Sequence, residues 1–69
     1  MEDWNRVVGS NVKRLRTARG LTQEKLAVDA EIDLTYAGGI ERGRRNPSLE
    51  VLGRLAAALN ADITELFER

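Results

Sequence analysis

Apolar residues recur at helical spacing in the first part of the chain. They lie three or four positions apart, and therefore on one side of an α-helix, at Trp4, Val8, Val12 and Leu15. Asp3 stands where an N-cap is expected, and Gly20 is a residue that commonly ends a helix. The pattern predicts a first helix from about Asn5 to Arg19.

Two short helices are predicted next. Thr22 is a capping residue, and the apolar side of the helix that follows it consists of Leu26, Ala27 and Ala30. Residues 31–33 form a short connection. Asp33 would then cap a third helix that reaches Arg42, is ended by Gly43 and has an inward side of Ala37 and Ile40.

The last third of the chain predicts two more helices. Ser48 would cap a fourth helix, whose apolar stripe consists of Leu49, Leu52, Leu55, Ala56 and Leu59. Asn60 suits the position just past the end of this helix. Asp62 and Glu65 form a near relative of the capping box before a fifth helix at about residues 62–69. Because no segment alternates apolar and polar residues, we expect no sheet, and the predicted fold is all-α, with five helices in a single domain over residues 1–69.

The length of the chain limits the core that it can build. A chain of 69 residues buries only roughly 60% of the surface that its unfolded form exposes, so a marginal monomer and a binding partner are expected. The absence of cysteine fits a reducing cytoplasm. No stretch approaches the roughly 18 apolar residues that a membrane span requires, so no membrane partner is expected.

The distribution of charge is more informative than its total. The 11 basic and 11 acidic side chains cancel, so net charge gives no argument for nucleic acid. Residues 6–25 nevertheless contain six cations and one acid, and a second basic cluster consists of Arg42, Arg44 and Arg45. Acids gather near the far end, at Asp62, Glu65 and Glu68. This distribution predicts one basic and one acidic face, although ordinary solvated helices could carry the same charges.

The residue types that enzymes use are scarce. With no histidine, no cysteine and no cluster of carboxylates, acid–base and nucleophilic chemistry lack their usual groups. We therefore expect no enzyme activity, no catalytic residue, no metal site and no cofactor. A core this small also leaves little room for a pocket, so no small-molecule substrate is expected.

The second and third helices have the proportions of a helix-turn-helix, at about residues 22–42, which places an exposed second helix in the DNA major groove. Four segments carry specific motifs: Leu21–Ala27, Thr35-Tyr36, Gly39–Gly43 and Arg45–Leu49. From about Val8 to Phe67 the chain resembles the helix-turn-helix family of Cro and phage repressors, and its Thr-Tyr and Gly-Ile-Glu-Arg-Gly motifs are most similar to controller proteins of restriction-modification systems. The resemblance implies a compact lambda-repressor-like domain, and a cytoplasmic, nucleoid-associated transcriptional regulator that binds a roughly palindromic operator on double-stranded DNA as a homodimer.

Base contacts are expected near the N-terminus of the third helix. The candidate base-contacting residues are Leu34, Thr35, Tyr36, Gly38 and Gly39. This chain departs from controller proteins here, because they usually have a polar or basic residue at Leu34, a larger apolar residue at Ala37 and a serine at Gly38. Leu34 can contact a thymine methyl group but cannot bond guanine, so we expect little direct readout and a contribution from DNA shape. A close approach of another backbone would equally explain the two glycines.

Phosphate contacts are expected on both sides of the third helix. The N-terminus of the second helix is suited to an anion, and Thr22 and Gln23 lie there. The resemblance implies that Gln23 contacts the DNA backbone and braces the recognition helix. Cations and an amide after the third helix would hold further phosphates, at Arg42, Arg44, Arg45 and Asn46. The plain alternative is that Thr22 only caps its helix and that Gln23 and the basic loop are only solvated.

The resemblance also implies an ion pair and a dimer interface. Arg16 and Glu41 would form a partly buried pair with a structural role, so removal of Glu41 alone should cost stability. The candidate dimer interface consists of Leu59, Ile63, Leu66 and Phe67. The alternative is that these residues belong to the core of the monomer. Trp4 could belong to the interface or cover the core. A twofold interface of this kind would space two recognition helices about 34 Å apart.

Two further functions remain open from the sequence. One is an antitoxin-like protein-interaction module of a toxin–antitoxin pair, and the other is a domain of this fold that has lost DNA binding. Binding to duplex DNA that weakens with salt would favour the regulator. Copurification with a partner at a defined stoichiometry would favour the interaction module.

Overall fold

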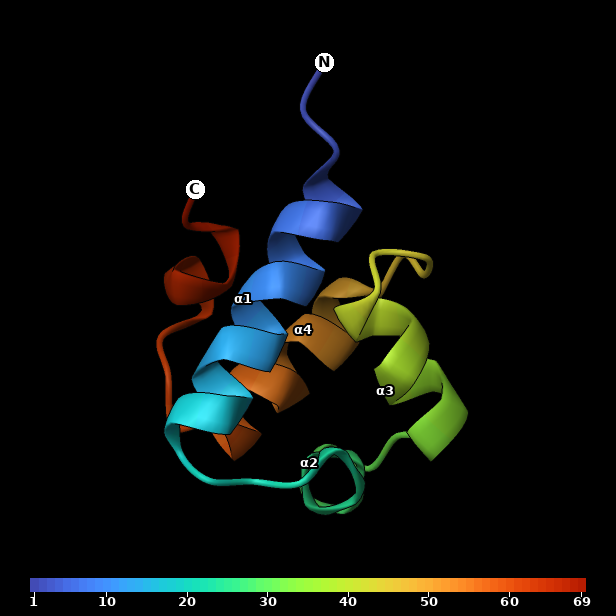
Figure 1. The fold of residues 1–69 in the computed structure, drawn as a ribbon, viewed down its shortest axis with the longest axis vertical. Helices are drawn as coiled ribbons and strands as arrows, with labels where there is room; N and C mark the ends of the chain where they lie inside the picture. The colour runs from blue at the N-terminus through green and yellow to red at the C-terminus, as the bar shows by residue number, and fades with distance from the viewer.

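Four α-helices and a terminal 3-10 helix make up the protein. The computed structural model describes residues 1–69, and its elements are α1 (Trp4–Ala18), α2 (Gln23–Ala30), α3 (Leu34–Glu41), α4 (Leu49–Ala58) and η1 (Ile63–Phe67). The all-α prediction is confirmed, with one correction: the fifth element is a 3-10 helix. This tighter form is common in short pieces, and only five residues take part. In Figure 1, α1 crosses in front of α4, and α3 and η1 lie on opposite sides of the molecule.

The first helix begins one residue earlier than predicted. The Asp3 side chain accepts a hydrogen bond from the Arg6 backbone N–H at 3.3 Å, which makes Trp4 the first helical residue. After Ala18 the chain leaves the helix through Gly20, whose φ of +69° explains the glycine there. Shifts of one residue at helix ends change nothing in the packing.

The caps of the next three helices were predicted with one error. Thr22 accepts from the Lys25 N–H at 3.0 Å, and Ser48 accepts from the Val51 N–H at 3.2 Å. Asp33 occupies the N-cap position of α3, but its side chain makes no capping hydrogen bond. The N-terminus of α3 therefore keeps backbone N–H groups that no side chain satisfies.

The apolar stripe of α4 differs from the prediction at one residue, because Val51 is buried in place of Leu49. Leu49 is 80% exposed, because it lies at the first position of the helix, outside the packed region. The buried side chains of α4 are instead Val51, Leu52, Leu55 and Ala56, followed by Leu59 at the C-cap. Asn60 adopts a φ of +52° just past the end, which confirms its predicted position.

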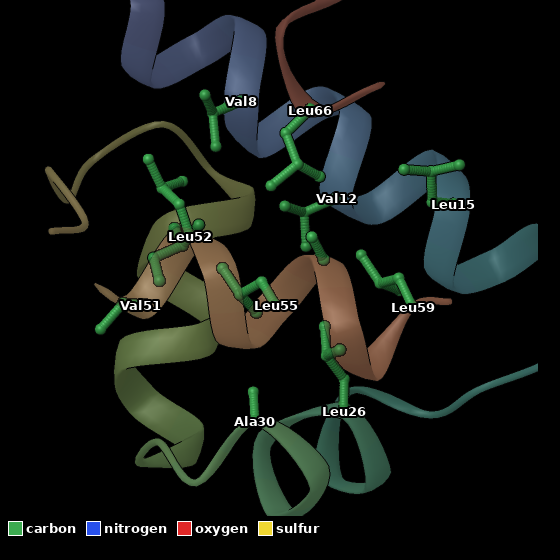
Figure 2. Close-up of a cluster of buried hydrophobic side chains, with 12 residues drawn as sticks. Val8, Val12, Leu15, Leu26, Ala30, Val51, Leu52, Leu55, Leu59 and Leu66 are labelled. Atoms are coloured by element: carbon green, nitrogen blue, oxygen red, sulfur yellow. The ribbon is translucent and has the colours of Figure 1, made fainter. Parts of the chain in front are cut away.

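The core lies between α4 and the helices around it. Its 12 residues come from all five elements: Val8, Val12, Leu15, Leu26, Ala30, Ile40, Val51, Leu52, Leu55, Ala56, Leu59 and Leu66. Figure 2 shows side chains of α1, α4 and η1 pointing toward one another, with Leu26 closing the lower side. Each fully buried leucine contributes about 2 kcal/mol of hydrophobic stabilisation, and α3 contributes Ile40 to this core. None of the helices combines the length and apolar character needed to cross a membrane.

Candidate nucleic-acid interface

α2 and α3 are arranged as a helix-turn-helix. α2 packs against α3 and α4, and α3 packs against α1. The connecting turn is residues 31–33, where Glu31 adopts the left-handed conformation with φ 58° and ψ 46°. Figure 1 shows α3 at the side of the molecule, where one of its faces is open to solvent. The pair therefore holds α3 on the body of the protein and leaves it able to approach another surface.

The five candidate base-contacting residues are not equally accessible. Leu34 is 41% exposed and Thr35 is exposed, whereas Tyr36 is half-buried and packs against the core. Gly38 and Gly39 are buried, so the expectation that they contact bases directly needs correction. The accessible part of α3 is its N-terminal turn.

Two arginine side chains cover the glycines of α3. A Cβ atom added at Gly38 would lie 3.1 Å from Nη1 of Arg42, and one added at Gly39 would lie 2.6 Å from Cγ of Arg45. Arg45 continues over the ring of Tyr36, with 4.6 Å between Cζ and the ring centroid. The close approach expected at these glycines is therefore made by side chains and not by another backbone.

The predicted ion pair between Arg16 and Glu41 is present. Nε of Arg16 donates to Oε2 of Glu41 at 2.6 Å, Nη2 donates to Oε1 at 3.2 Å, and the side chains are only 14% and 4% exposed. Arg16 also donates from Nη1 to the Leu21 carbonyl at 2.8 Å, and Gln23 donates from Nε2 to Oε1 of Glu41 at 3.0 Å. This network ties α1 and the start of α2 to the end of α3.

The candidate phosphate-binding residues lie around α3. Thr22 is exposed and caps α2. Gln23 is half-buried, because its side-chain amide donates a hydrogen bond to the carboxylate of Glu41. The loop after α3 is exposed at Arg42, Arg44, Arg45 and Asn46. None of its three arginines forms an ion pair. Their charge is therefore available to an anionic partner.

Two of the four candidate dimer residues lie inside the monomer. Leu59 and Leu66 have no exposed area, because both belong to the core, so they have no surface to offer a second copy. Ile63 and Phe67 are each 37% exposed. Trp4, 47% exposed, contacts Phe67 edge to face with 6.1 Å between ring centroids. The exposed apolar surface near η1 therefore includes Trp4.

Two residues important for this arrangement were missed by sequence reasoning. Asn11 is buried in α1 and donates from Nδ2 to the carbonyls of Leu66 at 2.9 Å and Glu68 at 2.7 Å, which holds the C-terminal segment on α1. Gly9 lies where α1 crosses α3, and a Cβ there would overlap the Ile40 carbonyl oxygen. A polar residue on an otherwise apolar helix face was the only signal for Asn11, and none existed for Gly9.

Comparisons with known proteins agree with this geometry. Residues 12–66 match the helix-turn-helix family model. The uncharacterized HTH-type transcriptional regulator y4dJ of Sinorhizobium fredii is 44% identical over 64 residues, which cover 93% of this chain and 83% of that protein. The control protein C.SmaI of Serratia marcescens is 37% identical over 67 residues, with 97% and 80% covered. The crystal structure of the restriction-modification controller protein C.AhdI from Aeromonas hydrophila has a TM-score of 0.88 and 46% identity, with 91% of this chain and 96% of that chain covered.

Proposed function

The chain belongs to the helix-turn-helix family of DNA-binding transcriptional regulators, and on that premise we propose that it binds a roughly palindromic operator as a homodimer and acts as the controller protein of a restriction-modification system. Such a protein would act on the nucleoid, in the cytoplasm. Binding would exclude polymerase from a promoter or recruit it, according to where the operator lies.

The strongest support comes from the surface around α3. Its N-terminal turn is exposed, and the loop after it carries three cations without ion-pair partners. An exposed helix of this kind fits the major groove, while cations beside it hold the phosphates and fix the register of the protein on DNA. No comparable group of unpaired cations lies around η1, where Arg14 and Arg69 are paired with acids.

The contacts divide by chemistry. Thr35 can form a hydrogen bond with a base edge, and Leu34 can contact a thymine methyl group. Tyr36 would extend the contact of Leu34 at the edge of this surface. Backbone phosphates would be held by Thr22, Gln23, Arg44, Arg45 and Asn46. Arg16 and Glu41 would not contact DNA, since their charges neutralise each other in the network that supports α3.

The proposed dimer uses the exposed apolar side chains near η1. Phe67, Ile63 and Trp4 are large apolar residues that a monomer of this size leaves in water. A twofold axis through this surface would set the two α3 helices on one side of the dimer, about 34 Å apart, to match successive turns of the major groove.

Fluorescence anisotropy tests the proposal. A labelled duplex from the promoter region of the protein's own gene is titrated at two salt concentrations beside a duplex of scrambled sequence. We expect tighter, saturable binding to the promoter duplex that weakens with salt, because cations released from the phosphates drive association. Equal or absent binding to the two duplexes would contradict a sequence-specific regulator.

A pair of arginine variants locates the binding face. Arg44→Ala should weaken binding to every duplex and lower the salt slope by about 1, because one phosphate contact is lost. Arg14→Ala removes a cation that is also exposed, but lies near the C-terminal segment, and it should leave the slope unchanged. If both variants change the slope equally, the loop after α3 is not the binding face.

A further inference from the structure

The exposed surface of α3 has few groups that can bond a base. Leu34 has no donor or acceptor, Gly38 and Gly39 have no side chain, and Thr35 alone is polar and exposed on the first turn. A guanine presents two acceptors in the major groove and is most often recognised by an arginine. One hydroxyl cannot donate to both acceptors of a guanine, so a regulator with this α3 needs a donor from elsewhere for bidentate recognition of guanine.

Arg42 brings a guanidinium to this surface. Arg42 follows Thr35 by about two helical turns and thus shares its face, and helical side chains lean toward the N-terminus. Its Nη1 lies 3.1 Å, and its Cζ 3.8 Å, from the position that a Cβ of Gly38 would occupy. The side chain is therefore folded back over Gly38, in the space that the glycine leaves.

The guanidinium of Arg42 is also uncommitted. It forms no ion pair and no hydrogen bond within the protein. Arg45 differs, because its stem packs on Gly39 and its guanidinium lies over Tyr36. Gln23 lies close to Arg42, with Oε1 3.4 Å from the Gly38 Cβ position, but its amide is held by Glu41.

We propose that Arg42 is a specificity-determining residue, whose guanidinium, lying over Gly38, donates to O6 and N7 of a guanine in each half-site. This role replaces the phosphate contact expected for Arg42 from sequence, and it rests on the DNA-binding function. It also gives Gly38 a purpose, because a Cβ there would lie 3.1 Å from Nη1 of Arg42 and a longer side chain would compete with the guanidinium for this space.

The test begins by selecting preferred duplexes from a random pool with the full chain. Each G·C pair of the selected site is then changed singly to A·T, or its guanine to 7-deazaguanine, which lacks the N7 acceptor. At one position per half-site both changes should weaken wild-type binding on the order of tenfold. Arg42→Ala should lose a similar factor on the selected duplex and then be insensitive, within about twofold, to the base at that position. The matched control Arg44→Ala should bind every duplex more weakly and keep the tenfold ratio.

Gly38→Ala provides a test that does not depend on deleting the arginine. The new methyl group would lie 3.1 Å from Nη1, so the guanidinium must shift by a few tenths of an ångström and base discrimination should fall. Because alanine favours the helix over glycine, the thermal midpoint should be unchanged or raised. Full discrimination in Arg42→Ala, or selected sites without guanine, would overturn the assignment of Arg42 and leave the regulator intact. Full discrimination in Gly38→Ala alone would contradict the role given to the space over Gly38. If the wild type prefers no duplex over a scrambled one, the DNA-binding function itself fails, and the role of Arg42 fails with it.

Discussion

Gly9 and Glu41 are the two residues on which the seating of α3 against α1 depends most. Gly9 lets the helix backbones approach so closely that a Cβ would overlap the Ile40 carbonyl oxygen. Glu41, 4% exposed, receives hydrogen bonds from Arg16 and Gln23 at the end of α3. Both act through the position of the recognition helix. Each can be tested by comparison with a control position, occupied by the same residue type, that lacks these contacts.

Gly9→Ala should destabilise the protein by about 3 kcal/mol, because the added methyl group pushes α1 away from α3. Gly53→Ala is the control: Gly53 lies within α4 with nothing within 4 Å of an added Cβ, so it should stabilise by about 1 kcal/mol through helix propensity. Chemical denaturation measures both. Similar free energies of unfolding for the two variants would show that the crossing of α1 and α3 tolerates a larger separation.

Glu41→Ala should cost about 3 kcal/mol, because it leaves Arg16 charged and only 14% exposed without its partner. Glu50→Ala breaks the exposed pair with Arg54 and should cost about 0.5 kcal/mol or less. The double variant Arg16→Met/Glu41→Leu should be more stable than Glu41→Ala, since no buried charge remains unpaired. An unchanged thermal midpoint in Arg16→Ala would refute this role for the pair.

The residue role that the family resemblance implied for the ion pair was predicted, and the roles that depend on packing were not. The pairing of Arg16 with Glu41 followed from the family resemblance, and the structure contains it. The bonds of Asn11 to the carbonyls of residues 66 and 68 follow only once the C-terminal segment lies on α1. In the same way, the burial of Gly38 and Gly39 depends on where two long arginine side chains lie, which no periodicity specifies.

At the scale of elements, the starts of helices were predicted well because caps are local. Thr22 and Ser48 cap as expected, and Asp62 with Glu65 forms a complete capping box. The end of α2 at Ala30 agrees with the predicted connection at residues 31–33, but the left-handed conformation of Glu31, which usually calls for glycine or asparagine, was not predicted. The turn between α2 and α3 therefore contains backbone strain at Glu31 that the sequence pattern did not predict.

Glu31→Gly should stabilise the protein by about 0.5 to 1 kcal/mol, since relief of the left-handed strain exceeds the added entropy of the unfolded chain. Asn60→Gly, at a φ of +52°, is the matched control and should change stability less, because asparagine already tolerates this conformation. Thermal and urea unfolding measure the difference. A loss of stability in Glu31→Gly would mean that the glutamate side chain adds more to the free energy of unfolding than its left-handed conformation costs.

The start of η1 should depend on pH through Asp62. Its carboxylate accepts hydrogen bonds from the backbone N–H and the hydroxyl of Thr64, and these bonds hold the pKa of Asp62 below its ordinary value of 3.8. Because the folded pKa is the lower one, this stabilisation is present above about pH 4 and is lost as pH falls through the lowered pKa. Thermal midpoints measured from about pH 5 to pH 2 should fall less steeply in Asp62→Asn than in the wild type. Parallel profiles would exclude Asp62 as a source of acid sensitivity.

For the whole molecule, the all-α class and the helix order could be predicted, but the division between core and surface at the C-terminal end could not. The apolar pattern there does not distinguish Leu66, which is fully buried, from Phe67, which is 37% exposed. That division depends on how η1 docks on α1 and α4. It also decides which side chains remain for a second copy of the chain.

Phe67→Glu should convert the proposed dimer into a monomer, because a charge would have to be desolvated in an apolar interface. Val28→Glu changes an exposed apolar residue of α2 by the same chemistry and should leave the dimer intact. Sedimentation velocity of folded samples, checked by circular dichroism, measures the mass. A wild-type protein that sediments as a monomer at concentrations where it binds operator, or a dimeric Phe67→Glu, would contradict the interface.

The contact made by Asn11 can form only late in the synthesis of the nascent chain. Its two acceptors lie 55 and 57 residues further along, so they leave the ribosome long after α1 has emerged. At roughly 5–20 residues per second, about 3 to 11 s separate the synthesis of Asn11 from that of Glu68. During that interval Nδ2 of Asn11 lacks its two carbonyl acceptors, and the apolar face of α1 lacks Leu66 to cover it. The hydrogen bonds of Asn11 can therefore form only after residues 66–68 have been made, and on a ribosome that stalls shortly before Leu66 the first helix would lack these contacts with the C-terminal segment.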